Sequence, residues 1–156
     1  MERKAVLGII GCGLIAQGVH IPNAFKNPRI RVKWCCDIMQ QNLDIVKSQY
    51  SPEYTTTNHM DVINDPEVDG VMLLTTHDVR FSLVEQAAKA GKDIYVEKPM
   101  STTVRESYDI MRVIRKYGVK LVVGFNRRCA PIIKDAVNIL NDQKQNPKDA
   151  PWRYKR

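Results

Sequence analysis

The chain has 156 residues, of which 44% are hydrophobic and 26% are charged. This size and composition are typical of one globular domain and exclude a disordered or collagen-like chain. The longest apolar runs, such as 71–74 and 121–123, are far shorter than the roughly 18 residues that a membrane-spanning helix requires. The start of the chain has no secretory signal pattern, so we expect a cytoplasmic protein without a membrane partner.

The net charge of +7 is concentrated in the C-terminal part of the chain. The first 111 residues carry 12 basic and 14 acidic side chains, whereas the last 45 carry 12 and 3. A basic end can bind phosphate backbones, but this one has neither interleaved aromatic residues nor a known nucleic-acid-binding motif. We therefore predict no nucleic-acid partner.

The four cysteines do not form a metal-binding pattern. Cys12, Cys35, Cys36 and Cys129 contain no C-x-x-C pair and no Cys/His spacing suited to zinc. We predict that they are reduced, mostly buried side chains, and that the protein has no metal site.

Short apolar runs alternate with amphipathic segments along the chain. The predicted strands are 5–10, 30–36, 70–74, 93–96 and 119–123. The predicted helices are 41–50, 79–90, 103–118 and 131–140. A further helix is predicted directly after the first strand, and Pro22 should limit or kink it. Such alternation favours parallel pairing with right-handed crossovers. The predicted fold class is therefore α/β, with a Rossmann-type doubly wound parallel sheet in three α-β-α layers.

The first run leads directly into Gly11-Cys-Gly-Leu-Ile-Ala16, which fits the pattern G-x-G-x-x-A. Gly11 would allow the tight turn, Gly13 would let the main chain approach a pyrophosphate, and Ala16 would permit close packing of helix on sheet. The N–H groups near Leu14 and Ile15 would point at the phosphates. A tight strand-to-helix turn without a ligand has the same pattern, so a second feature is needed.

That second feature is Asp37, which ends the second apolar run 24 residues after Gly13. A carboxylate at this offset receives the ribose hydroxyls of a dinucleotide. It would repel a 2′-phosphate, and 38–40 contain no arginine to bind one, so we predict NAD rather than NADP. A domain that binds S-adenosylmethionine is an alternative, because it too places a glycine turn after its first strand.

Two further positions lie where open parallel sheets bind ligands. Thr75 and Thr76 follow the apolar run at 71–74 and would lie at the carboxyl edge of the sheet. The three histidines, His20, His59 and His77, have no accompanying Ser or Cys nucleophile pattern. We expect them to be ordinary surface, packing or capping residues.

The segment 87–99, which ends in Glu97-Lys98-Pro99, resembles the A-G-K-x-V-x-x-E-K-P signature of the glucose-fructose oxidoreductase and inositol dehydrogenase (Gfo/Idh/MocA) family. Residues 124–128 resemble its next landmark. The resemblance implies an NAD(P)-dependent oxidoreductase of sugars, cyclitols or related polyols, with Lys98 as the catalytic residue that handles the proton. It also implies that Glu97 orients Lys98 or contacts the cofactor, and that Asn126 faces the nicotinamide ribose or the substrate.

The same resemblance implies a two-domain protein. Residues 1–125 would form the NAD(P)-binding domain, and 126–156 would begin a substrate and oligomerisation domain that completes a homo-oligomer. We therefore expect a fragment that binds NAD but does not turn over substrate alone, with 152–156 as an orphan strand. The alternative is a non-catalytic NAD-binding sensor or interaction module, in which Lys98 is only a surface charge.

Overall fold

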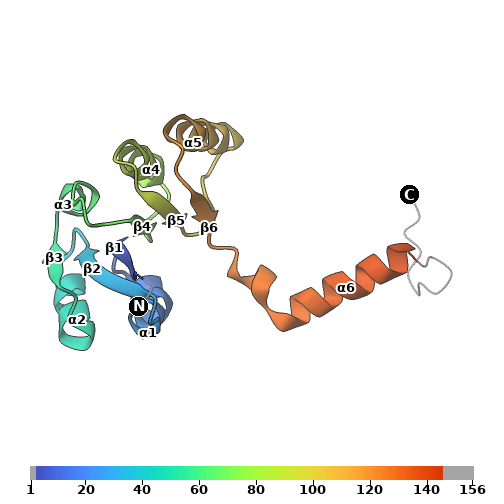
Figure 1. Ribbon diagram of the computed structural model, residues 1–156, viewed down its shortest axis with the longest axis horizontal. Helices are drawn as coiled ribbons and strands as arrows, with labels where there is room; N and C mark the ends of the chain where they lie inside the picture. Colours follow the sequence, from blue (N-terminus) through green and yellow to red (C-terminus); the bar gives the residue numbers. More distant parts are fainter. Residues whose placement is uncertain (1–2, 146–156) are drawn as a thin grey trace. The chain divides into compact units, whose positions relative to one another are not determined.

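The computed structural model describes residues 3–145 and separates into two compact units, one ending at Gly124 and the other beginning at Phe125. The first unit contains a six-stranded sheet in the order β3-β2-β1-β4-β5-β6, with every pair parallel (Figure 1). Its strands are β1 (Ala5–Ile10), β2 (Ile30–Cys36), β3 (Tyr54–Thr56), β4 (Gly70–Leu73), β5 (Asp93–Val96) and β6 (Leu121–Val123). This order, with its reversal between β1 and β4, is that of the Rossmann fold, which confirms the predicted fold class.

Helices connect the strands and cover both faces of the sheet. They are η1 (Ala16–His20, π geometry), α1 (Ile21–Lys26), α2 (Gln40–Tyr50), α3 (His59–Ile63), α4 (Arg80–Lys89) and α5 (Val104–Tyr117). Strand β3 and helix α3 were not predicted, because three and five residues are too few to show a hydrophobic period. The other predicted elements of this unit are present, with ends shifted by up to two residues.

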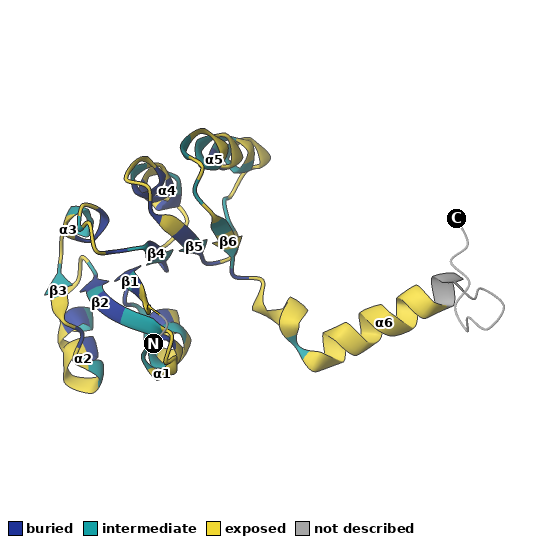
Figure 2. Cartoon of the chain, in the orientation of Figure 1, coloured by how far each residue is buried: buried dark blue, intermediate teal, exposed yellow. Residues whose placement is uncertain are grey.

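The sheet separates two apolar cores. Helices α1 and α2 lie on one face and α3, α4 and α5 on the other (Figure 1). Ile21 and Leu43 belong to the first core, and Val62, Val84 and Ile110 to the second. Figure 2 shows much of β1, β2, β4 and β5 and of the inner helix faces as buried, whereas the edge strands β3 and β6 have no buried residue. The burial of the central strands explains why they read as near-continuous apolar runs in the sequence.

Helix α5 has the predicted local signals at both ends. The Thr103 hydroxyl accepts a hydrogen bond from the Glu106 N–H at 3.1 Å. The Glu106 carboxylate reaches back to the N–H of Thr102 at 3.3 Å, rather than to that of Thr103, so the capping box is displaced by one residue. At the other end Gly118 has φ +67° and closes the helix.

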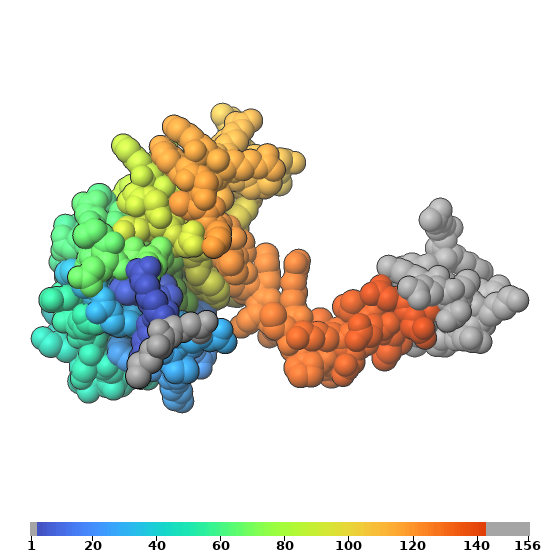
Figure 3. All heavy atoms as spheres, in the orientation of Figure 1, coloured from blue at the N-terminus to red at the C-terminus, as the bar shows by residue number. Residues whose placement is uncertain are grey.

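Residues distant in sequence meet where the strands begin. In the space-filling view the first described residues, in dark blue, lie against the green segment that precedes β4 (Figure 3). There the guanidinium of Arg3 pairs with Asp69 at 2.7 Å, and the other carboxylate oxygen of Asp69 accepts from the N–H of Val6 at 2.8 Å. These bonds fix the start of β1 beside β4.

The second unit contains η2 (Asn126–Cys129, a 3₁₀ turn) and α6 (Pro131–Gln145). The Arg128 guanidinium lies over the Phe125 ring at 5.1 Å. The start of a substrate domain at this point remains a prediction, and the predicted strand 152–156 lies outside the described residues. None of the helices described has the length and apolar character needed to cross a membrane.

Candidate cofactor-binding site

The turn after β1 is held tightly against the end of β4. Gly11 has φ +95°, a conformation that favours glycine. A Cβ at this position would lie only 2.8–2.9 Å from main-chain atoms of Leu74 and Thr75. The N–H of Gly11 also donates to the carbonyl of Cys36 at 2.8 Å. The turn therefore joins the ends of β1, β2 and β4, and only glycine fits there.

Gly13 has open space where a side chain would begin. A Cβ built there meets no atom within 4 Å, in contrast to Gly11. Residues from Leu14 onward are helical, and the Leu14 side chain is 92% exposed. The first N–H groups of a helix lack intrahelical partners and attract anions. The main chain at Gly13 is thus open to a ligand beside a helix N-terminus.

Asp37 lies beside this turn, directly after β2. One carboxylate oxygen accepts from the N–H of Cys12 at 2.6 Å, and the other accepts from the N–H of Met39 at 2.8 Å. An ionised carboxylate has lone pairs for further donors. Asp37 is therefore fixed at the turn and retains capacity to accept hydroxyl groups.

The loop after β4 adds a buried polar atom. The hydroxyl oxygen of Thr75 is buried and has no hydrogen-bond partner among the described residues, whereas Thr76 is exposed. Buried hydroxyls are normally hydrogen-bonded. The orphaned Thr75 hydroxyl, the open Gly13 and the fixed Asp37 together fit a dinucleotide at the point where the strand order reverses.

Glu97 is the buried centre of the next loop, which follows β5. It is 8% exposed, and its Oε2 accepts from the N–H of Lys98 at 3.0 Å. Its Oε1 lies 2.8 Å from Nε2 of His20 and accepts from the Tyr95 hydroxyl at 3.4 Å. Burial, reinforced by the Glu97 carboxylate, raises the pKa of Tyr95, so the phenol keeps its proton. Glu97 thus holds the Lys98 main chain, while the Lys98 side chain is exposed.

Of the roles expected for His20, a surface position is wrong and a packed position fits. Its side chain is 11% exposed and pairs with Glu97, 77 residues further along the chain. The π geometry of η1, in which the N–H of Ile21 bonds to the carbonyl of Ala16, immediately precedes α1 and ends at His20. Such π segments are frequent at functional sites, but no pattern in the sequence predicted this one.

Other residues named from the sequence perform separate roles or belong to the second unit. His59 bonds to the side chain of Gln86 at 2.8 Å. Asn126 belongs to the second unit, so its part in a cofactor site stays a prediction. Among residues 3–145, no group of three His, Cys, Asp or Glu side chains could hold a metal ion.

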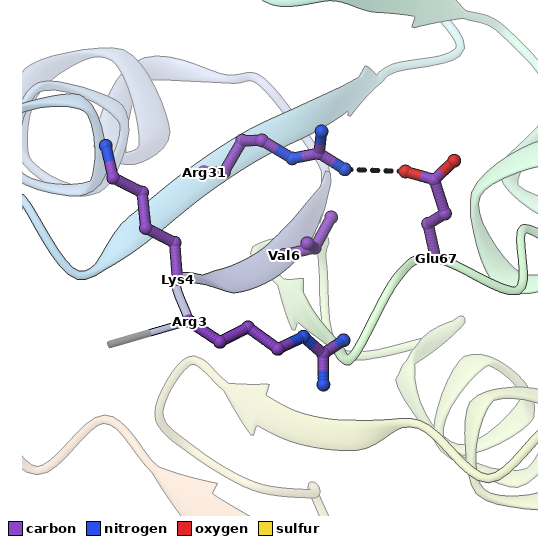
Figure 4. Close-up of a pocket in the computed structure, with 5 residues that line it drawn as sticks. All are labelled: Arg3, Lys4, Val6, Arg31 and Glu67. Atoms are coloured by element: carbon purple, nitrogen blue, oxygen red, sulfur yellow. Dashed lines mark hydrogen bonds and ion pairs between the residues drawn. The ribbon is translucent and has the colours of Figure 1, made fainter. Parts of the chain in front are cut away.

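A cavity of about 330 Å³ lies at the opposite, amino-terminal edge of the sheet (Figure 4). It is lined by Arg3, Lys4, Val6, Arg31 and Glu67. Its arginines are already paired, Arg31 with Glu67 at 2.6 Å and Arg3 with an acid before β4 at 2.7 Å. Because ligands of open α/β sheets bind at the carboxyl edge, this cavity is not the candidate site.

The comparisons with known proteins agree with the geometry at the carboxyl edge. A model of the family described as "Oxidoreductase family, NAD-binding Rossmann fold" matches residues 6–125. The chain belongs to this oxidoreductase family. The match extends from β1 through the loop that follows β6 and confirms the resemblance seen in the glycine turn and the Glu97-Lys98-Pro99 segment.

Relatives of this oxidoreductase family include two proteins of Bacillus subtilis (strain 168). The uncharacterized oxidoreductase YrbE is 32% identical over 142 residues, covering 91% of this chain and 41% of the relative. scyllo-Inositol 2-dehydrogenase (NAD(+)) is 27% identical over 137 residues, covering 87% and 40%. The chain therefore spans about two fifths of the length of these relatives.

A solved structure gives the same fold. The crystal structure of scyllo-inositol dehydrogenase from Lactobacillus casei, with bound NAD(H) and scyllo-inositol, superimposes with a TM-score of 0.84. The sequence identity is 22%, and the match covers 91% of this chain and 42% of that one. At this identity the similarity establishes the Rossmann-like architecture alone.

Proposed function

We propose that this chain binds NAD(H) across the carboxyl edge of its sheet and forms the cofactor-binding part of a dehydrogenase of cyclitols, sugars or related polyols. The diphosphate would lie against the main chain at Gly13, and the ribose hydroxyls would bond to Asp37. Thr75 and Thr76 would line the site from the β4 side. The similarity to the scyllo-inositol 2-dehydrogenase of Bacillus subtilis supports the choice of a polyol.

The observation that carries the proposal is the contrast between the two glycines of the turn. Gly11 is enclosed by main-chain atoms of the neighbouring strand, whereas the space at Gly13 is empty. Folding explains the first glycine, whereas the second, like Gly18, has open space around it and lies in the turn that begins the first helix. A pyrophosphate that approaches the main chain would use this open space.

The choice of NAD over NADP rests on Asp37. Hydrogen bonds from two N–H groups fix its carboxylate beside the turn. A 2′-phosphate there would meet a negative charge, and the following Ile38 and Met39 are exposed apolar side chains that cannot neutralise it.

Lys98 would handle the proton of the reacting hydroxyl. When bound, the nicotinamide would accept a hydride from the carbon that carries this hydroxyl. The exposed Lys98 amine can take the hydroxyl proton when unprotonated, and its ammonium can return a proton to the carbonyl oxygen in the reverse direction. Glu97 would act by holding the main chain of Lys98.

The binding step is tested with Gly13→Ala and the matched control Gly18→Ala, since a Cβ at either position meets no protein atom within 4 Å. We expect the wild-type chain to quench or enhance NADH fluorescence on binding. Gly13→Ala should weaken binding at least about tenfold without lowering the thermal unfolding temperature, and Gly18→Ala should bind normally. Equal affinity of the wild type and Gly13→Ala would contradict the proposed phosphate position.

The chemical step is tested in the whole protein that carries this domain. NAD⁺ reduction is measured over a panel of cyclitols and sugars, and Lys98→Met should lower kcat by about a hundredfold or more on any substrate that reacts, with little change in NADH affinity. Retention of full activity would refute the role of Lys98. NADH binding without turnover of any polyol would favour a sensor.

A further inference from the structure

Arg80, the first residue of α4, is a buried cation that the proposed chemistry does not use. It is 3% exposed, and its guanidinium donates to three main-chain carbonyls. Nη2 bonds to the carbonyl of Thr75 at 2.6 Å, and Nη1 bonds to the carbonyls of Glu97, at 2.8 Å, and of Pro99. None of the ion pairs in the described part of the chain involves Arg80. Carbonyl groups alone therefore receive this buried charge.

Packing alone does not explain an arginine at this place. Burying a charge without a bonded carboxylate is costly, and apolar residues of similar volume often stabilise a core better. The Nε of Arg80 is buried and has no hydrogen-bond partner among the residues described. Burial lowers the pKa of Arg80, against the opposing influence of Glu97 and Glu106. A specific task for the guanidinium would account for its retention.

The positions of the three carbonyl groups in the chain indicate what the Arg80 guanidinium does. Those of Glu97 and Pro99 flank Lys98 on either side, and that of Thr75 belongs to the loop after β4. The N–H of Lys98 is held independently by the Glu97 carboxylate. The main chain around Lys98 is thus fixed from several directions, although the Lys98 side chain is exposed.

We propose that Arg80 is a positioning residue for Lys98: its planar guanidinium joins the loops after β4 and β5 and sets the starting point of the lysine side chain beside the dinucleotide site. The inference deepens the proposed function and rests on it for the role of Lys98. A guanidinium has five N–H donors in a fixed planar array, whereas an ammonium is a point charge on a flexible stem. Arg80→Lys should therefore restore the charge without restoring the geometry.

The first test needs no cofactor. Amide hydrogen exchange is compared in the wild type, Arg80→Met, Arg80→Lys and the control Arg112→Met, whose arginine is 81% exposed and pairs with Asp109 on its own helix. We expect exchange in peptides covering 97–101 and 74–77 to rise about tenfold or more in Arg80→Met, and by less in Arg80→Lys. Peptides from β2 and α2, and the control variant, should be unchanged. A uniform rise along the chain, or no local rise, would overturn the proposal.

The second test measures the placement of the Lys98 amine. Its acylation is followed by mass spectrometry at saturating NADH, with the exposed Lys116 of α5 as internal reference. We expect NADH to slow acylation of Lys98 in the wild type, and this protection to be lost in Arg80→Met even when NADH is saturating. Equal protection in both proteins would overturn the inference. A wild-type chain that fails to bind NADH would refute the proposed function, and the exchange experiment would still decide the role of Arg80.

A third variant keeps the proposal testable if Arg80→Met does not fold. If Arg80→Met does not give a cooperative thermal transition, Arg80→Ala is tested with millimolar ethylguanidinium, which can occupy the space of the missing side chain. Recovery of slow exchange at 97–101 with ethylguanidinium, but not with ethylammonium, would support positioning by the planar group. Equal recovery with both cations, or no recovery with either, would overturn it.

Discussion

Asp37 caps the glycine turn, and in the proposed function it would also bond to the ribose; substitution can separate these two roles. Asp37→Asn keeps one side-chain oxygen for the N–H of Cys12 but removes the negative charge. We expect NADH affinity to fall about tenfold, or about 1.4 kcal/mol, while NADPH affinity falls less or rises. Fluorescence titration with both cofactors checks this, with Asp44→Asn on the exposed side of α2 as control. Equal losses for both cofactors would show that Asp37 does not select against the 2′-phosphate.

The candidate site residues that the sequence suggested and those that it did not suggest differ in how far along the chain their partners lie. Gly11, Gly13 and Asp37 were proposed because a short motif and a fixed offset describe a local turn and the end of one strand. His20 and Arg80 bond to the loop after β5 from positions 77 and 17 residues away. Contacts between separate elements depend on the assembled sheet, so one sequence without its fold carries no spacing rule for them.

At the scale of elements, local signals determined which predictions succeeded. Helix α5 has a capping hydroxyl at Thr103 and a left-handed glycine at its end, and it was predicted at the right place. Pro22 was expected to limit or kink the first helix, but helical geometry continues to Lys26. Pro22 lies at the start of α1, directly after the π segment, where a missing N–H donor matters least. The π segment thus explains why the helix does not end at the proline.

The pairing of β2 with the turn before β4 gives an acid-dependent contribution to stability. Burial alone would raise the pKa of Asp65, but hydrogen bonds from Lys33 and Trp34, each at 2.7 Å, outweigh it and lower the pKa to about 2. A pKa below its unfolded value near 4 means that the stabilisation is present above about pH 4 and is lost as the pH falls toward 2.

We therefore expect the free energy of unfolding to fall between pH 4 and 2 by an amount on the order of 1 kcal/mol attributable to Asp65, because solvent screens part of the interaction. Asp65→Asn should be less stable at pH 7 and should lose less stability over this pH range. Urea unfolding at several pH values measures both effects, with Asp109→Asn on α5 as the control. If the free energy of unfolding fell equally between pH 4 and 2 in the wild type and in Asp65→Asn, the acid-dependent contribution would not come from Asp65.

At the scale of the whole molecule, the fold was predictable because its largest features are periodic. Apolar strands alternating with helices specify a parallel sheet covered on both faces, and the glycine turn identifies the strand at its centre. The β3–α3 connection and the contacts among loops arise from packing of the complete sheet. The sequence therefore indicated the candidate dinucleotide site more clearly than the contacts that hold the loop after β5.

The two compact units also differ in how they protect their thiols. Cys12, Cys35 and Cys36 are buried in the first unit, whereas Cys129 in the second is exposed. A hydrogen bond with Cys35 and burial raise the pKa of Cys12 far above its ordinary value, and burial raises the pKa of Cys36 to about 12. Since the thiolate is the reactive form, buried thiols of this kind are inert until the structure opens.

We expect a thiol reagent such as DTNB at pH 8 to modify one cysteine of the native chain rapidly and all four after denaturation. Cys129→Ser should abolish the rapid phase and leave the slow phase unchanged, because the slow phase requires opening of the first unit. NADH should slow that phase further if it binds beside Cys12, since a ligand that binds only the folded state reduces the open population. Rapid reaction of two or more native thiols would show that the core around β1 and β2 is not closed as described.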